Sequence, residues 1–96
     1  AAALGHIEAM AYFADHLERG LGVNVDYDLA AQLFYRSFKL GSPWAYKRLY
    51  DQGRSRPLAI MKKVQQLMLE DRVYRSTVDG LFGGGTRAAL RRALKL

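Results

Sequence analysis

Residues 78–90 read VDGLFGGGTRAAL, and this stretch decides how the C-terminal half of the chain folds. The pair Asp79-Gly80 predicts a turn, because glycine accepts positive φ and an aspartate side chain bonds back to its own backbone. Leu81 and Phe82 follow the turn directly. We expect these two side chains to fold back onto a core as an apolar plug.

The three glycines at 83–85 let the backbone pass closely and open a final helix. We expect this helix to begin at or near Arg87, with Thr86 helping to cap it. Backbone N–H groups at a helix start can also bind an anion. A nucleotide site is excluded, because the loop lacks a Gly-Lys-Ser/Thr sequence and no apolar strand precedes it.

A polar, basic segment at residues 54–57 (RSRP) separates two different sequence patterns. It ends in a proline suited to a helix start. A length of 96 residues suffices for one compact domain or two small modules. We predict two modules, residues 1–53 and residues 54–96, which touch across this short junction. The opening residues are helical in pattern and carry no initiator Met, so we take the chain as part of a longer protein.

Composition limits the possible classes of protein. Half of the residues are hydrophobic (50%), which is typical of a folded chain. No apolar run approaches the roughly 18 residues that a membrane span needs. The absence of cysteine excludes disulfides and thiolate metal sites.

Charge is distributed unevenly between the two predicted modules. Residues 1–53 contain five basic and six acidic residues, whereas residues 54–96 contain ten basic and three acidic residues. Any anionic partner is therefore expected to bind the C-terminal module.

The N-terminal module has the pattern of a helical repeat. Apolar residues spaced by three and four predict a helix over residues 2–19, in which Ala9, Ala11 and Ala14 let another helix approach closely. A second helix is predicted to end at about Leu40 after an Asp26 or Asp28 cap. A third is predicted from Ser42-Pro43 to about residue 52.

This half resembles the Sel1-like repeat family, a relative of the tetratricopeptide repeat. The resemblance covers residues 3–53, about one and a half repeats, and implies stacked α-helices with a surface for a protein partner. It is carried by Gly5, Ala9, Gly20, Gly22, Val23, Asp26, Ala30, Phe34 and Gly41.

The second half is predicted to form a helix over residues 57–71, a connector over 72–77, the stretch described above and a last helix. It resembles the peptidoglycan-binding domain family, which implies a small three-helix fold. The motif residues are Met61, Val64, Gln65, Met68, Val78, Asp79, Gly80, Phe82, Gly83, Thr86, Ala89 and Leu90. We expect Gln65 on the flank of the apolar stripe of the helix over residues 57–71. The chain departs from the family at 71–73, where Asp-Arg-Val replaces a usual Leu-Gly-Tyr.

The resemblance implies peptidoglycan as a partner of the second module. Most of the motif residues are expected to be structural, so exposed polar neighbours are the better candidates for contacting a polar polymer. The candidate peptidoglycan-binding residues are Arg75, Ser76, Thr77, Asp79, Arg87 and Arg91.

Aromatic residues are dense between residues 12 and 50 and are expected to form mainly the core between helices. Tyr35 and Tyr46 are our candidates for facing a protein partner. The aromatic set comprises Tyr12, Phe13, Phe34, Tyr35, Phe38, Trp44, Tyr46 and Tyr50.

Catalysis and cofactors are not expected. His6 and His16 lie ten residues apart, so they do not form a metal pair on one turn, and no Ser/His/Asp or Cys/His set can be assembled. A nucleic-acid-binding fragment is a weaker alternative, because the basic residues are spread out and no recognition helix is evident. We predict no enzyme activity, no cofactor, no metal and no nucleic-acid partner.

The sequence thus predicts an all-α chain with a helical repeat followed by a peptidoglycan-binding-like bundle. The expected function is that of a non-catalytic scaffold in the periplasm, at the bacterial cell wall. The order of the two modules is similar to that in polar localisation factors of the cell envelope. The alternative is a pure protein-interaction module whose second half is a degenerate cap.

Overall fold

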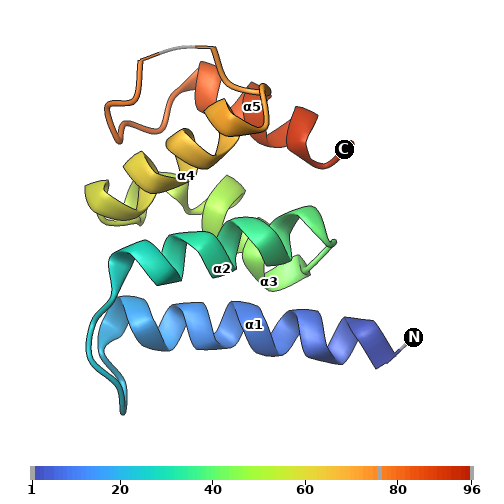
Figure 1. Cartoon of the computed structure of the whole chain (residues 1–96), viewed down its shortest axis with the longest axis vertical. Helices are drawn as coiled ribbons and strands as arrows, with labels where there is room; N and C mark the ends of the chain where they lie inside the picture. The colour runs from blue at the N-terminus through green and yellow to red at the C-terminus, as the bar shows by residue number, and fades with distance from the viewer. Residues whose placement is uncertain (1, 76, 96) are drawn as a thin grey trace.

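The computed structural model describes residues 2–75 and 77–95, and these residues form an all-α fold without strands (Figure 1). The three long helices are α1 (Ala2–Arg19), α2 (Tyr27–Lys39) and α4 (Leu58–Glu70). The shorter elements are helix α3 (Pro43–Tyr46), the π-helical segment η1 (Lys47–Asp51), the 3₁₀ turn η2 (Gly53–Ser55) and helix α5 (Gly84–Ala93).

The first two helices form an antiparallel pair (Figure 1). Ala11 and Ala14 are fully buried where α2 packs on α1, so the prediction that they allow close approach is confirmed. Ala9 is exposed, and that part of the prediction is wrong because this residue lies on the opposite face of α1. Asp26 caps α2 by accepting a hydrogen bond from the Leu29 amide at 3.0 Å.

The third helix begins where predicted but changes its winding. Ser42 caps α3 by accepting a hydrogen bond from the Ala45 amide at 3.0 Å. After one turn the helix continues as η1, whose wider turns bury Leu49 and Tyr50. The 3₁₀ turn η2 then leads into the junction.

The two predicted modules share one hydrophobic core. Helix α2 lies between α1 and α4 (Figure 1) and packs against both. Buried side chains from both halves, such as Phe38, Leu49, Met61 and Leu90, belong to one continuous cluster. Among the described residues, 54–96 contribute two α-helices rather than the three that the family resemblance implies.

A buried ion pair reinforces the junction. The Arg56 Nη1 atom lies 2.6 Å from both carboxylate oxygens of Glu18, near the end of α1. The two side chains are only 6% and 10% exposed. Removing one partner of such a pair leaves an uncompensated buried charge, so the pair fixes the junction against α1.

The stretch at residues 78–90 differs from expectation in two respects. Helix α5 begins at Gly84 rather than near Arg87, because the glycines themselves adopt helical geometry. Leu81 is 62% exposed and is not part of an apolar plug. Phe82 does pack against the core, and its ring lies over Gly53, where an added Cβ would sit 2.4 Å from the ring.

Arg72 adopts a backbone conformation that favours glycine. Helix α4 ends in a Schellman motif, in which the Val73 amide bonds to Met68 O and the Arg72 amide bonds to Leu69 O, both at 3.0 Å. This motif gives Arg72 a φ of 63°, the only positive φ of a non-glycine residue among those described. The position is the one at which the resembled family has glycine.

The strain at this position gives the first prediction. Arg72→Gly should stabilise the chain by about 1 kcal/mol, because a left-handed conformation costs a residue with a Cβ roughly that much. Urea unfolding followed by circular dichroism would measure the change. Arg72→Ala is the control, since it keeps the Cβ and should leave the free energy of unfolding within about 0.5 kcal/mol of wild type.

Candidate functional site

The loop before α5 is held by the side chain of Gln65. This residue is fully buried, contrary to the expectation that it lies on the flank of the apolar stripe of its helix. Its Oε1 accepts hydrogen bonds from the backbone amides of Asp79 at 3.0 Å and Gly80 at 2.8 Å. Its Nε2 donates to Leu81 O at 3.0 Å and to Thr86 Oγ1 at 3.1 Å. One buried amide therefore fixes the turn, the chain after it and the start of α5.

This arrangement gives Asp79 and Thr86 structural roles. Asp79 Oδ1 accepts from the Leu81 amide at 2.9 Å, as in an Asx turn. That hydrogen bond is the main reason why the pKa of Asp79 is lowered. Thr86 is buried and its hydroxyl donates to Leu81 O, so it ties the loop together rather than capping α5 as expected.

Arg87 and Arg91 come together on the face of α5 that meets η1. The Arg91 Nε atom donates to the Tyr50 hydroxyl at 2.7 Å. The Arg87 guanidinium lies 5.0 Å from the centroid of the Tyr50 ring and 5.3 Å from that of Phe82. We call this group (Tyr50, Phe82, Arg87 and Arg91) the arginine seam.

The arginine seam carries unneutralised positive charge. Both arginines are exposed, and within the described residues neither makes a salt bridge. Exposed Arg54 directly follows Gly53 in the chain, and the Phe82 ring lies over Gly53. The sequence pattern alone does not mark Tyr50 or Arg54 as site residues. Tyr50 and Arg91 are 41 positions apart, and no local pattern links them.

The other polymer-binding candidates are not part of this seam. Arg75 and Thr77 are exposed on the connector between α4 and α5, and no contact joins them to Arg87 or Arg91 in the described part of the chain. The Thr77 carbonyl accepts a hydrogen bond from the Tyr74 hydroxyl at 2.7 Å, which shapes the connector. Ser76 lies outside the described residues.

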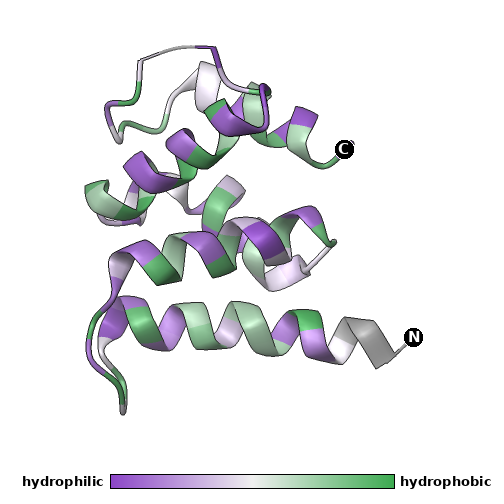
Figure 2. Cartoon of the chain, viewed as in Figure 1, coloured by the Kyte–Doolittle hydropathy of each residue, from purple (hydrophilic) through white to green (hydrophobic). Residues whose placement is uncertain are grey.

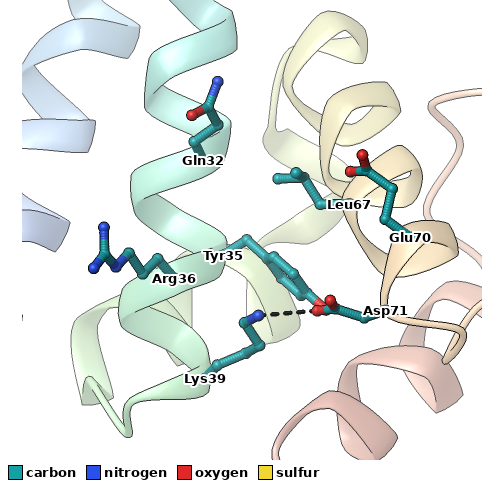
Figure 3. Close-up of a pocket in the computed structure, with 7 residues that line it drawn as sticks. All are labelled: Gln32, Tyr35, Arg36, Lys39, Leu67, Glu70 and Asp71. Atoms are coloured by element: carbon teal, nitrogen blue, oxygen red, sulfur yellow. Dashed lines mark hydrogen bonds and ion pairs between the residues drawn. The ribbon is translucent and has the colours of Figure 1, made fainter.

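Tyr35 is buried against the second half instead of facing a partner. It is 3% exposed, and its hydroxyl donates to Asp71 Oδ2 at 2.6 Å. Lys39 Nζ bonds to the same oxygen at 2.9 Å, so two side chains of α2 converge on the end of α4 (Figure 3). The expectation of an exposed Tyr35 is therefore wrong, because α4 covers that side of α2.

These contacts perturb the pKa of both partners. Burial, followed by the adjacent carboxylate, raises the pKa of Tyr35. Hydrogen bonds from Tyr35 and then Lys39 lower the pKa of Asp71. An open pocket of about 290 Å³ lies beside them, but Arg36 on its rim points away from α4 in Figure 3. Lys39 and Asp71 on its wall already neutralise each other in an ion pair.

Tyr46 lies where a partner could reach it. It is 38% exposed and stacks between Phe38, at 5.8 Å, and Tyr50, at 4.9 Å between ring centroids. It lines a mostly apolar groove of about 340 Å³, which we call the tyrosine groove. The groove is formed by Phe38, Gly41, Ser42, Pro43, Tyr46 and Leu94.

Within residues 2–75 and 77–95, no three His, Cys, Asp or Glu side chains gather where they could hold a metal ion. None of the helices there is long and apolar enough to cross a membrane. A scan against protein-family models and searches of curated proteins and of solved structures found no match to this chain. The two family resemblances therefore stay predictions from sequence.

The Gln65 network gives the second prediction. Gln65→Leu should destabilise the chain by about 3 kcal/mol, because it leaves the backbone amides of Asp79 and Gly80 without their partner and removes one of the two donors to the Leu81 carbonyl. Differential scanning calorimetry or urea unfolding would measure the loss. Gln66→Leu is the matched control, since Gln66 is exposed and its replacement should change stability by no more than about 0.5 kcal/mol. Equal effects of the two variants would contradict the structural role of Gln65.

The Asp71 contacts give the third prediction, on pH dependence. A carboxylate whose pKa is lowered on folding stabilises the protein above its unfolded pKa, and this contribution is lost as the pH falls. Unfolding free energy should therefore drop below about pH 4, and less steeply in Asp71→Asn. At neutral pH this variant should lose about 1 kcal/mol, since it weakens two hydrogen bonds to a charged group. Urea unfolding across a pH series tests both effects, with the exposed Asp51→Asn as control.

Proposed function

We propose that this chain is a non-catalytic binding module of the bacterial cell envelope, acting in the periplasm as part of a longer scaffold protein. Its arginine seam binds peptidoglycan, and its tyrosine groove binds a protein partner. Polar localisation of the larger protein is part of the same proposal. The sequence resemblances supply the class of polymer, and the geometry supports particular residues for the contact.

The wall-binding part depends on one observation, the pairing of Arg87 and Arg91 over Tyr50, where neither arginine forms a salt bridge in the described part of the chain. A guanidinium group binds a carboxylate through two parallel hydrogen bonds, and peptidoglycan stem peptides carry carboxylates. Because the rings of Tyr50 and Phe82 hold one face of each arginine side chain, less side-chain entropy is lost on binding. These features favour a polar anionic ligand.

The protein-binding part depends on the tyrosine groove. A groove lined by Phe38, Pro43, Tyr46 and Leu94 can accept an apolar side chain of a partner, and Tyr46 supplies both ring surface and a hydroxyl. Aromatic residues of this kind dominate the energetics of protein interfaces. The alternative of a pure protein-interaction module would keep this groove and lose the function of the seam.

Retention on purified, protein-free peptidoglycan sacculi tests the wall-binding proposal. The wild-type chain should be retained at low and at moderate salt, and Arg87→Gln/Arg91→Gln should lower its apparent affinity by more than about tenfold, through loss of two charge-assisted contacts. Arg36→Gln/Arg72→Gln removes the same charge from exposed positions outside the seam and should keep most of the binding.

The controls distinguish the alternatives. Equal losses in the two double variants would show that net charge alone binds the wall and would contradict a defined seam. Absence of wild-type retention would reject the wall-binding proposal and leave the protein-interaction alternative. A nucleic-acid-binding fragment would instead bind oligonucleotides with an affinity that falls by orders of magnitude between low and moderate salt.

A further inference from the structure

The arginine seam and the tyrosine groove are lined by the same two rows of side chains. On α5, Arg87, Arg91 and Leu94 follow at spacings of four and three residues, which places them along one side of the helix. In the other row, Tyr46 and Tyr50 stack with 4.9 Å between their ring centroids. Tyr50 contacts both arginines, and Tyr46 and Leu94 both line the groove. The seam therefore continues directly into the groove.

The chemistry of this surface changes along its length. Arg91 donates its Nε–H to Tyr50, and within the described residues its two Nη atoms make no hydrogen bond or salt bridge. At the other end, Phe38, Pro43 and Leu94 give the groove its apolar lining. Figure 2 shows the same change on α5, whose last turn passes from purple to green toward the C-terminus. One end thus offers cationic donors, and the other offers an apolar recess.

Two acidic side chains adjoin this surface without neutralising the seam. Asp51 follows Tyr50 and is exposed, and it forms no salt bridge in the described part of the chain. Glu8 lies at the opposite end, where its carboxylate accepts a hydrogen bond from the Ser42 hydroxyl on the groove wall. A ligand carboxylate is repelled by Glu8 and attracted by the arginines. This polarity fixes the direction in which a ligand with one acidic and one apolar group can bind.

We infer that the partner of the tyrosine groove is a protein segment carrying an aspartate or glutamate two or three positions from a large apolar side chain. The segment is the partner already proposed for the groove, so its assignment rests on that proposed function. An α-helix rises about 1.5 Å per residue, which puts Leu94 roughly 4 to 10 Å along α5 from Arg91 and Arg87. An extended segment advances about 3.3 Å per residue, so two or three positions match this span.

The occupant follows from the two ends taken together. A guanidinium group binds a carboxylate through two parallel hydrogen bonds, and the groove excludes water best around a large apolar side chain. A glycan strand has no such apolar group, whereas a peptide carries both groups at a fixed interval on one chain. Since the wall is proposed to bind through the same arginines, the partner segment and peptidoglycan exclude each other at the seam.

Selection from a random decapeptide library on the immobilised full chain tests the chemistry of the partner. Selected peptides should combine an aspartate or glutamate with a leucine, isoleucine, phenylalanine or tryptophan two or three positions away. The absence of any enrichment, or enrichment of peptides without an acidic residue, would overturn the inference.

Fluorescence anisotropy with the selected peptide then tests each end of the surface. Arg87→Gln/Arg91→Gln should weaken binding more than about tenfold, yet it should bind the analogue peptide with the acidic residue amidated as well as wild type does. Equal losses for both peptides would contradict a contact between the acidic residue and the seam. Leu94→Ser should weaken binding about fivefold, through loss of apolar contact. Leu69→Ser, at a position 44% exposed on α4, is the matched control and should bind as wild type does.

Competition on sacculi separates this inference from wall binding. Wild-type chain retained on sacculi should lose about tenfold in apparent affinity when the selected peptide is present at about ten times its Kd. Undiminished retention would contradict the shared use of the arginines. Failure of the wild-type chain to bind sacculi would reject wall binding alone, and the peptide measurements would then decide the nature of the partner.

Discussion

The burial of one amide, that of Gln65, organises the C-terminal half of this chain. A fully buried glutamine is unfavourable unless its oxygen and nitrogen are both hydrogen-bonded, and here the partners are backbone and side-chain groups 14 to 21 positions later. Because the Gln65 amide hydrogen-bonds to backbone groups of residues 79–81, it holds the turn in one geometry. That geometry directs Leu81 outward, places Phe82 on Gly53 and starts α5 at Gly84. The same hydrogen bonds of Gln65 therefore also determine where the arginine seam lies.

The second organising feature is the sharing of α2 by both halves of the chain. Its one side packs on α1 and its other on α4, so neither half encloses a complete core by itself. The arginine seam is a product of this packing, since Tyr50 comes from the first half and both arginines come from the second. The aromatic stack from Phe38 through Tyr46 to Tyr50 also joins the tyrosine groove to the seam. The two proposed binding surfaces are therefore connected by one stack of aromatic rings.

Sequence patterns correctly predicted the features that local interactions determine, namely the long helices and their caps. Helical periodicity located the long helices, and the caps at Asp26 and Ser42 follow from residue type and position. The patterns failed where a distant partner decides the outcome. Periodicity places Gln65 at the edge of an apolar stripe but cannot reveal that a turn made later encloses it. Tyr35 looked available to a partner because the packing of α4 on α2 is not encoded in the spacing of either helix.

The same limit applies to the candidate site. Arg87 and Arg91 are identified by charge and by their separation of one helical turn, whereas Tyr50 acquires its role only through a contact 41 positions away. Leu81 was misassigned because an apolar residue after a turn is more often buried than projected. The direction in which the turn projects it depends on Gly80 lying against Leu58, which is again a tertiary contact.

The ion pair between Glu18 and Arg56 limits which segments of this chain can be exchanged by recombination. The two residues lie on opposite sides of the boundary that the sequence predicts near residue 54, and both are almost completely buried. A recombination crossover at that boundary would pass on α1 with a buried carboxylate and no counter-charge. The next contact in order, Tyr35 with Asp71, extends this dependence to the end of α4. The segment that can move between proteins as a unit therefore runs at least from α1 to Asp71, and residues 1–53 are not an exchangeable part on their own.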